Sequence, residues 1–238
     1  MKSMMSGVED RNVQIWDSYY SSLQDSYLFP NEYAVRTFLG TYPRLRIDKN
    51  YGGKRICDIS CGDGRNMTLF HKLGFILYGT ELTSNICKIT TDKLRSSAEI
   101  NAEIRPGSNT SLPFPDGFFD YMLSWNACYY MHDENSSISD HISEYARIAK
   151  TGAYLVVSVP APGCFSLLGA EQIGGDLIRI KTASKWGILN GSIYHQFRSF
   201  EDIETKFGTH FCNFQKCIIK DDCYGLPLEY FIFVCQKL

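Results

Sequence analysis

The chain has 238 residues, enough for one α/β domain with a sizeable core, and its hydrophobic share of 44% and charged share of 21% are typical of a globular protein. A formal net charge of −2 offers no general attraction to nucleic acid or to an anionic membrane. The nine cysteines form no C-x-x-C pair, so we expect reduced thiols and no metal site. No apolar leader and no apolar run of membrane-spanning length occur, which predicts a soluble, cytoplasmic protein without membrane insertion.

Helical spacing of apolar residues covers 8–40 and is broken near Pro30. After residue 54, short apolar strands alternate with helices, which predicts a mainly parallel sheet with helices on both faces. The expected strands cover 55–59, 76–79, 104–105, 119–124 and 153–159, and the expected helices 66–73, 84–98, 138–149 and a segment from Phe200. Two last strand-like segments, 211–219 and 229–236, are joined by a loop too short for a crossover helix and should pair antiparallel.

The stretch 56–66, ICDISCGDGRN, turns from an apolar strand into two glycines, Gly62 and Gly64. In such sheets ligands bind beyond the carboxyl ends of the strands. Glu81 ends the second strand 19 residues after Gly62, a spacing at which an acid accepts hydrogen bonds from both ribose hydroxyls. The pair predicts an adenosine-type ligand, whereas the glycines alone would fit an ordinary tight turn equally well.

The glycine turn departs from a pyrophosphate-binding turn, because Met67 stands where a third glycine would be. Asp58 and Asp63 also bring negative charge to the place where a pyrophosphate would lie. The turn therefore disfavours a nicotinamide dinucleotide and favours S-adenosylmethionine, which carries an ammonium and a sulfonium. A nicotinamide-dependent oxidoreductase and a non-catalytic S-adenosylmethionine-binding partner protein are the alternatives.

From about residue 54 to 160 the chain resembles class I S-adenosylmethionine-dependent methyltransferases, of the type 11-like kind. The resemblance rests on the turn above with Glu81, on SLPFPDGFFD (111–120) followed by YMLSW (121–125), and on EYARIAKTG (144–152) followed by the strand 153–159. It implies an α/β, Rossmann-like seven-stranded sheet, mostly parallel with an antiparallel last strand and with helices on both faces. It also implies S-adenosyl-L-methionine as cofactor and S-adenosyl-L-homocysteine as product.

The resemblance also implies which residues contact the cofactor. Ser60 replaces the usual glycine of the first motif, and Ser108 with Asn109 stands where an acid often lies near the adenine, so the adenine contacts stay open. The expected cofactor-binding residues are Asp58, Ser60, Gly62, Gly64, Asn66, Glu81, Leu82, Ser108, Asn109, Ser124, Asn126 and Tyr20.

A single domain, 1–238, is expected, since no linker or repeat divides the chain. Its expected parts are an N-terminal helical lid (1–45), a cofactor-binding core (54–160), an acceptor-site insertion (161–198), and a C-terminal helix with antiparallel strands (199–238). Tyr19 and Tyr20 either close over the cofactor or simply pack their helix.

The segment 124–132 lacks the Asn/Asp-Pro-Pro-Tyr/Phe run of enzymes that methylate exocyclic amines of bases, and there is no Pro-Cys nucleophile. A small-molecule acceptor, methylated at oxygen or less often at an aliphatic amine, is therefore expected, with no nucleic acid as partner. A neutral hydroxyl needs a general base. His132 and His195 are the candidates, either of which can be merely structural, and Tyr129 is expected at the reacting site.

Basic and aromatic residues are interleaved in the insertion and form either a solvated face or an anion site for a phosphate, phosphoramidate or carboxylate. The expected acceptor-binding residues are Arg179, Lys181, Lys185, Tyr194 and Arg198. The segments WDSYYSS and DISCGDGRN also resemble methyltransferases of bacterial capsule and surface-polysaccharide clusters. That resemblance implies O-methylation of a sugar or of a phosphate- or phosphoramidate-type acceptor.

Overall fold

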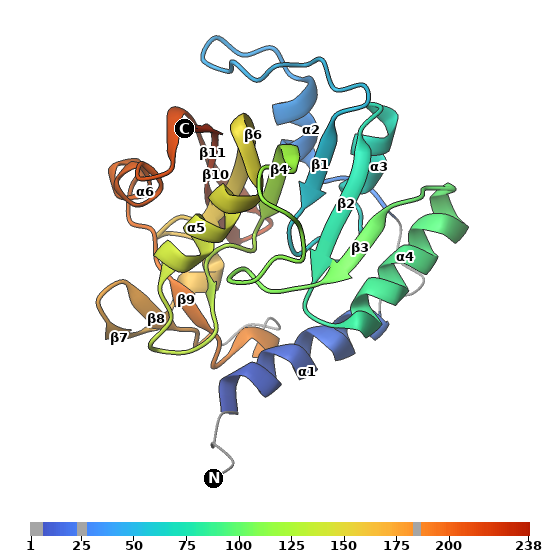
Figure 1. Cartoon of the computed structure of the whole chain (residues 1–238). Coiled ribbons are helices and arrows are strands. Elements are labelled where there is room, and N and C mark those ends of the chain that lie inside the picture. Colours follow the sequence, from blue (N-terminus) through green and yellow to red (C-terminus); the bar gives the residue numbers. More distant parts are fainter. Residues whose placement is uncertain (1–6, 23–27, 183–186) are drawn as a thin grey trace.

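A seven-stranded sheet runs through the centre of the computed structural model, which describes residues 7–22, 28–182 and 187–238 (Figure 1). The strand order is β10-β11-β6-β4-β1-β2-β3. The strands are β1 (Arg55–Asp58), β2 (Ile76–Glu81), β3 (Glu103–Pro106), β4 (Phe119–Trp125), β6 (Ala149–Pro160), β10 (Phe211–Cys223) and β11 (Leu226–Lys237). Neighbours from β3 to β6 pair in parallel, and β11 runs against both β6 and β10. The expected mostly parallel sheet with a reversed last strand is confirmed.

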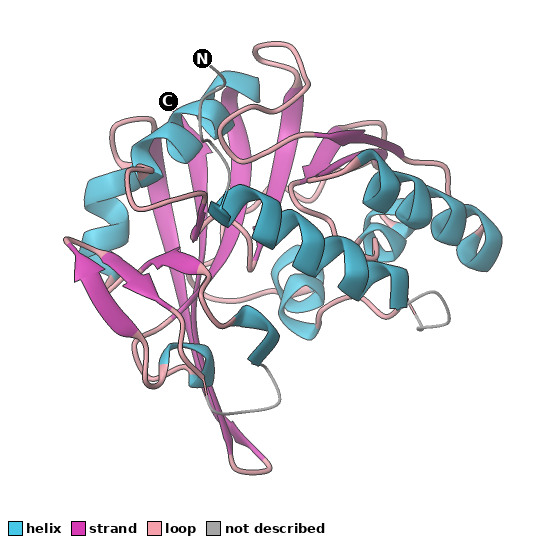
Figure 2. Cartoon of the chain, turned by 90° about the horizontal axis from the view of Figure 1, so that it is seen from below, coloured by secondary structure: helices cyan, strands magenta, loops and turns pink. Residues whose placement is uncertain are grey.

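Helices cover both faces of this sheet (Figure 2). They are α2 (Glu32–Leu39), α3 (Met67–Lys72), α4 (Ser84–Ala98), α5 (Ile138–Ile148) and α6 (Phe200–Phe207), whereas α1 (Gly7–Ser22) lies at the end of the sheet. Phe38 of α2 and Phe70 of α3 belong to a core with Ile56, whereas Tyr145 of α5 and Phe207 of α6 belong to a core on the other face. Successive strand residues alternate between these two cores, as the pleat of a strand requires.

A second, four-stranded sheet stands beside the first, in the order β5-β9-β8-β7. Its strands are β5 (Tyr130–Met131), β7 (Glu171–Gly174), β8 (Leu177–Arg179) and β9 (Ile193–His195), all antiparallel to their neighbours. The 3₁₀ turn η1 (Phe165–Leu167) lies between β6 and β7, and the 3₁₀ turn η2 (Gly187–Leu189) lies between β8 and β9. The segment 161–198 therefore pairs with β5, which follows β4. The sequence did not predict this arrangement, because strands of two to four residues are too short to show a recognisable pattern.

Helix α1 lies across the end of the main sheet, between the second sheet and α4 (Figure 1). The Asp17 carboxylate fixes it to the start of α4, where it accepts hydrogen bonds from the Thr83 hydroxyl (2.8 Å) and the Asn85 amide (3.0 Å). Thr83 caps α4 by accepting a hydrogen bond from the Ile86 N–H, so one side chain joins both helices. In the part of the chain that is described, no helix is both long and apolar enough to cross a membrane.

Candidate active site

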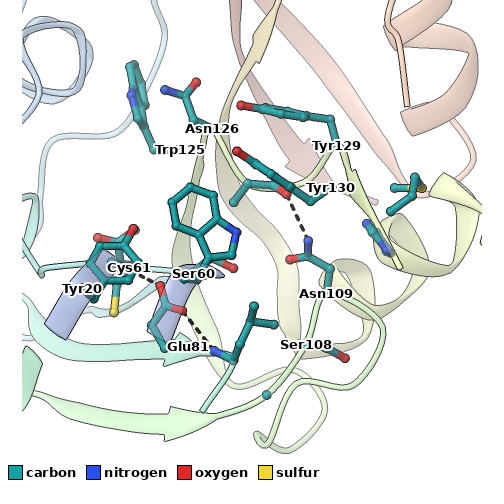
Figure 3. A pocket seen from close by; sticks show the side chains of 18 of the residues that line it. Tyr20, Ser60, Cys61, Glu81, Ser108, Asn109, Trp125, Asn126, Tyr129 and Tyr130 are labelled. Atoms are coloured by element: carbon teal, nitrogen blue, oxygen red, sulfur yellow. Dashed lines mark hydrogen bonds between the residues drawn. The ribbon is translucent and has the colours of Figure 1, made fainter. Parts of the chain in front are cut away.

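A cavity of about 980 Å³ opens at the carboxyl ends of the parallel strands. The last residues of four strands, Asp58, Glu81, Pro106 and Trp125, all line it. Tyr20 of α1, Cys61 and Glu81 lie on one side, and Tyr129 and Tyr130 lie across from them (Figure 3). Its volume is at the upper end for ligand pockets, enough for a nucleoside and a second small molecule.

The turn after β1 is made by three residues with positive φ: Ser60 (55°), Gly62 (59°) and Gly64 (77°). A Cβ on Gly62 would lie 2.5 Å from the Tyr20 hydroxyl, so α1 rests directly on this glycine. A Cβ on Gly64 would instead meet Thr90 and Leu94 of α4 at 3.0 Å. Gly62 lines the cavity and Gly64 does not, because Gly64 serves the packing of the turn on α4.

Glu81 is buried, and both of its carboxylate oxygens accept hydrogen bonds from backbone amides. Oε1 accepts from the Gly62 N–H (2.7 Å) and Oε2 from the Leu82 N–H (3.0 Å). Burial raises the pKa of Glu81 to about 7, and the two amides hold it from rising further. Each oxygen keeps a second lone pair, so the carboxylate can still accept hydrogen bonds from two hydroxyls.

Asp58 is 1% exposed, and its Oδ2 has no hydrogen-bond partner among the described residues. Burial raises its pKa, and the negative charges of Glu81 and Asp63 add to that shift. Asp63 is paired with Arg65, whose guanidinium lies 2.9 Å away. A buried carboxylate without a partner is costly unless a cation reaches it, so this half of the cavity fits a positively charged ligand group.

The far end of this half is formed by the loop after β3. Ser108 and Asn109 both line the cavity, as do Asn66 and Leu82. The Asn109 amide donates to the Ala127 carbonyl (3.1 Å) and accepts from the Tyr145 hydroxyl (2.8 Å).

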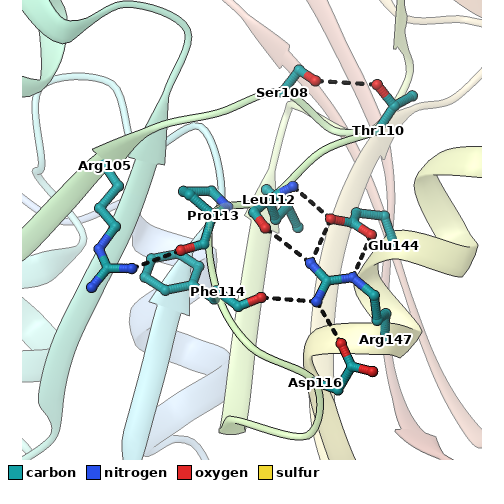
Figure 4. Close-up of polar contacts among 9 residues, drawn as sticks. All are labelled: Arg105, Ser108, Thr110, Leu112, Pro113, Phe114, Asp116, Glu144 and Arg147. Carbon is teal, nitrogen blue, oxygen red and sulfur yellow. Dashed lines mark hydrogen bonds and ion pairs between the residues drawn. The ribbon is translucent and has the colours of Figure 1, made fainter.

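An ion pair on α5 clamps the same loop (Figure 4). Arg147 donates to the carbonyls of Leu112 (2.9 Å) and Phe114 (2.8 Å), and Glu144 accepts from the Leu112 N–H (2.6 Å). Arg147 and Glu144 also bond to each other at 2.7 Å. Helix α5 therefore sets the position of the loop that carries Ser108 and Asn109.

Two expected cofactor residues differ in their placement. Asn126, at φ 53°, lines the cavity and is held by Ser158, whose hydroxyl accepts from the Asn126 N–H (2.9 Å) and donates to its side-chain oxygen (2.8 Å). Ser124 is fully buried, bonds to the Tyr145 hydroxyl (3.2 Å), and does not line the cavity. Strand alternation turns Ser124 toward α5, so its contact is to the core.

Aromatic rings form the opposite half of the cavity. The ring centroid of Tyr194 lies 4.8 Å from that of Tyr129 and 4.5 Å from that of Tyr130, and Trp16 of α1 packs edge-on against Tyr130 at 5.7 Å. Tyr230 of β11 also lines this half. Burial raises the pKa of Tyr129 well above its usual value, so its phenol stays protonated and donates rather than accepts a proton at neutral pH.

The two expected histidines are separated by the structure. His132 is exposed and lines the cavity. His195 does not, because it follows Tyr194 on β9 and points to the opposite face. It is buried against Phe197 with Nε2 unpartnered among the described residues, and burial lowers its pKa to about 4. The expectation that His195 meets an acceptor is therefore not supported by this geometry.

The three described basic residues expected to bind the acceptor lie away from the cavity and are paired with carboxylates. Arg179 pairs with Glu134, Lys181 with Glu171, and Arg198 with Asp176. Lys185 lies outside the described residues. Of the four described residues in the expected acceptor set, Tyr194 is the one that lines the cavity.

Several cavity-lining side chains escaped the sequence analysis, among them Trp16, Cys61, Arg65, Trp125, His141 and Tyr230. His141 had a readable signal, because it shares the buried stripe of α5 with Ile138, Ile142 and Tyr145. Tyr230 had none, since it reaches the cavity only through the pairing of β11 with β6. Among residues 7–22, 28–182 and 187–238, no group of three or more His, Cys, Asp or Glu side chains could hold a metal ion.

The mostly parallel sheet with an antiparallel β11, together with the cavity at the glycine turn after β1 and at the buried acid that ends β2, makes this a Rossmann-like fold of the kind found in S-adenosylmethionine-dependent methyltransferases. Residues 57–157 match the family model described as a methyltransferase domain. Over 109 residues the chain is 28% identical to an uncharacterized methyltransferase, YcgJ, of Bacillus subtilis (strain 168); this match covers 45% of this chain and 42% of the relative. The chain thus matches less than half the length of that curated relative.

Solved structures agree with this fold. A methyltransferase described as S-adenosylmethionine-dependent, from Methanosarcina mazei, is 19% identical, with a TM-score of 0.60 over 83% of this chain and 98% of that one. A complex of the Trm112 methyltransferase activator from Haloferax volcanii contains a chain that is 14% identical, with a TM-score of 0.66 over 97% of both chains. At these identities the likeness shows the fold alone.

Proposed function

We propose that this chain transfers the methyl group of S-adenosylmethionine to a hydroxyl of a small molecule. The observation that carries the proposal is the convergence of Asp58, Gly62 and Glu81 on one cavity at the ends of β1 and β2. The unpartnered oxygen of Asp58 fits the cationic part of this cofactor, and Glu81 has acceptor capacity left for the ribose hydroxyls. The remaining residues proposed to hold it are Tyr20, Ser60, Asn66, Leu82, Ser108, Asn109 and Asn126.

The bound cofactor supplies an electrophilic methyl group, so the protein has to align the acceptor and exclude water. Tyr20 and Trp16 of α1 are proposed to do the second task, because they cover the cavity from Gly62 to Tyr130. Tyr129 and Tyr194 are proposed to line the acceptor subsite as protonated phenols.

The charges around the cavity favour a neutral acceptor. Arg65, among the described cavity-lining residues, is the one permanent cation, and Asp63 already pairs with it. The aromatic side chains that line the cavity, Tyr129, Tyr130 and Tyr194, present flat apolar faces on which the apolar face of a sugar can stack. We therefore favour a sugar hydroxyl over a phosphate or phosphoramidate, in keeping with the resemblance to surface-polysaccharide methyltransferases. All nine cysteines are free thiols, which fits the proposed cytoplasmic location.

Isothermal titration with S-adenosylmethionine, S-adenosylhomocysteine and NAD tests the cofactor. Heat from the first two and none from NAD is expected, with Glu81→Ala binding much more weakly; heat from NAD alone would overturn the proposal. Transfer of a labelled methyl group is then measured to neutral methyl glycosides and, for comparison, to sugar phosphates. Methylated glycoside supports a neutral acceptor, and methylated phosphate only would reverse that choice.

A further inference from the structure

His141 occupies a position on α5 that the sequence alone did not single out. It is 2% exposed and yet lines the cavity, alongside Asn109, Asn126 and Tyr129. Ser137 caps the helix just before it, and the clamp by Arg147 lies less than two turns further on. The imidazole is therefore carried by a helix fixed at both ends, which is how a reacting group is held in place.

The hydrogen bond of its ring fixes where the proton lies. Nδ1 is 2.8 Å from the carbonyl oxygen of Cys128, and a carbonyl can only accept. Nδ1 therefore carries the hydrogen, and in the neutral ring Nε2 carries the lone pair. The ring has no other hydrogen bond to the described residues, so the lone pair of Nε2 is available to a group in the cavity that His141 lines.

The surroundings keep this ring neutral. Burial lowers the pKa of His141 below 6.5, while the Cys128 carbonyl and Asp140 on the same helix oppose that shift. From the second sheet, His195 is the titratable group that interacts with it, and it too has a lowered pKa. A neutral imidazole with a fixed tautomer and a free lone pair is the form that accepts a proton.

We propose that Nε2 of His141 is the general base that removes the proton of the acceptor hydroxyl, an inference that rests on the proposed methyl transfer. The hydroxyl oxygen forms the new bond to the methyl carbon, and the carbon–sulfur bond breaks with its electron pair left on sulfur. The hydroxyl proton passes to Nε2, and the imidazolium later releases it to water. The acceptor class is then an un-ionised hydroxyl, because an acceptor that is already an anion needs no base.

The other candidates fit this role less well. Tyr129 is protonated at neutral pH, and His195 faces away from the cavity. His132 lines the cavity but is exposed, so water competes for its ring.

The first test needs no acceptor. Long-range proton–nitrogen spectra of the full chain labelled with [15N]histidine are recorded between about pH 5 and 8, and the His141 signals are assigned from their loss in His141→Asn. A proton on Nδ1, an unprotonated Nε2 and a titration midpoint below 6.5 are expected. A proton on Nε2, or a ring that is charged at neutral pH, would overturn the proposal.

The second test measures turnover with the glycoside that the chain methylates best. His141→Asn keeps a donor for the Cys128 carbonyl and removes the base, so kcat should fall about 100-fold or more, while the dissociation constant of S-adenosylhomocysteine and the melting temperature stay close to those of the parent chain. His71→Asn, an exposed control on α3 outside the cavity, should leave turnover unchanged. Full turnover by His141→Asn, or loss of turnover in His132→Asn instead, would refute the role of His141.

The two tests also separate this inference from the proposed function. If neither S-adenosylmethionine nor its product binds, the proposed function fails, whatever the state of the ring. If both bind and the ring carries its proton on Nε2, the base assignment fails alone.

Discussion

The close contact between Gly62 and Tyr20 allows α1 to pack on the glycine turn. Gly62→Ala would strain a backbone at φ 59° and place a methyl group against the Tyr20 hydroxyl, 2.5 Å away. Gly225→Ala is the matched control, because it has φ 85° and open space around its Cβ position. We expect the control to lose about 1 kcal/mol of unfolding free energy, and Gly62→Ala to lose at least as much and also to bind S-adenosylhomocysteine at least about tenfold more weakly. Equal cofactor affinity in both variants, measured by titration calorimetry, would show that the contact with Tyr20 is unimportant.

If Glu81 binds the cofactor as proposed, cofactor affinity should depend on pH. With a pKa of about 7 it is mostly protonated at pH 6 and mostly ionised at pH 8. Because only the carboxylate accepts from both ribose hydroxyls, affinity for S-adenosylhomocysteine should rise up to about tenfold between these values. Glu81→Gln should flatten the profile, and Glu103→Gln, outside the cavity, should not.

The Glu81 carboxyl should have the opposite effect on the stability of the ligand-free chain, which should fall as the pH rises. The pKa of Glu81 is raised on folding from 4.5, so its contribution to stability is complete below pH 4.5 and is lost as the pH rises through 7. Rising affinity with falling ligand-free stability is therefore expected over this window. A melting temperature of the ligand-free chain that rose from pH 5 to 7 in the parent chain more than in Glu81→Gln would contradict this assignment.

Helix α5 acts as one element that positions the loop after β3 and, through His141, the acceptor half of the cavity. Arg147→Lys removes the planar fork that reaches two carbonyls and Glu144, and should lower the unfolding free energy by about 1–2 kcal/mol. Cofactor affinity should fall as well, because the loop carries Ser108 and Asn109. Arg36→Lys, at an exposed pair on α2, is the control and should change neither quantity in urea unfolding and titration calorimetry.

Helix α1 depends on Asp17 for its attachment to α4. Asp17→Ala removes the acceptor for Thr83 and Asn85, so the lid should open more often and the dissociation rate of S-adenosylhomocysteine should increase about tenfold. Stopped-flow displacement measures this rate. The control Asp92→Ala, which removes an exposed carboxylate on α4 itself, should leave the dissociation rate unchanged. If Asp17→Ala also released S-adenosylhomocysteine at the rate of the parent chain, α1 would not control its release.

The sequence predicted the elements whose information is local. The turn with Gly62, the acid Glu81 and the main strands are encoded by contiguous motifs, and the structure has them within a few residues of the expected bounds, except that β6 and β10 begin or end about four residues further out. The second sheet was missed because strands of two to four residues carry too little pattern, and its pairing is between distant segments. Without that pairing, the sequence could not show which of His195 and His141 lines the cavity. The register of β9 turns His195 away from the cavity, and the buried stripe of α5 turns His141 toward it.

At the scale of the whole molecule, the cavity is lined by three parts of the structure that come from separate segments of the sequence. The main sheet supplies Asp58 and Glu81, the second sheet supplies Tyr194, and α1 supplies Trp16 and covers both. Because Trp16 packs on Tyr20 at 5.8 Å and on Tyr130 at 5.7 Å, α1 touches both the half of the cavity proposed for the cofactor and the half proposed for the acceptor. Binding in one half should therefore order the other.

Hydrogen exchange measures this coupling directly. S-adenosylhomocysteine should slow exchange about tenfold or more in the turn after β1 and in 13–22 of α1, where Tyr20 is proposed to contact it. It should also slow exchange in β5, which it does not contact in the proposed arrangement. The hairpin tip at 222–225, far along β10 and β11, should exchange equally with and without the ligand (Figure 2). Trp16→Ala should remove the protection of β5, because it removes the ring that bridges Tyr20 and Tyr130. Protection of β5 that persisted in Trp16→Ala would mean that the main sheet, through β4, carries the coupling and that the lid only follows it.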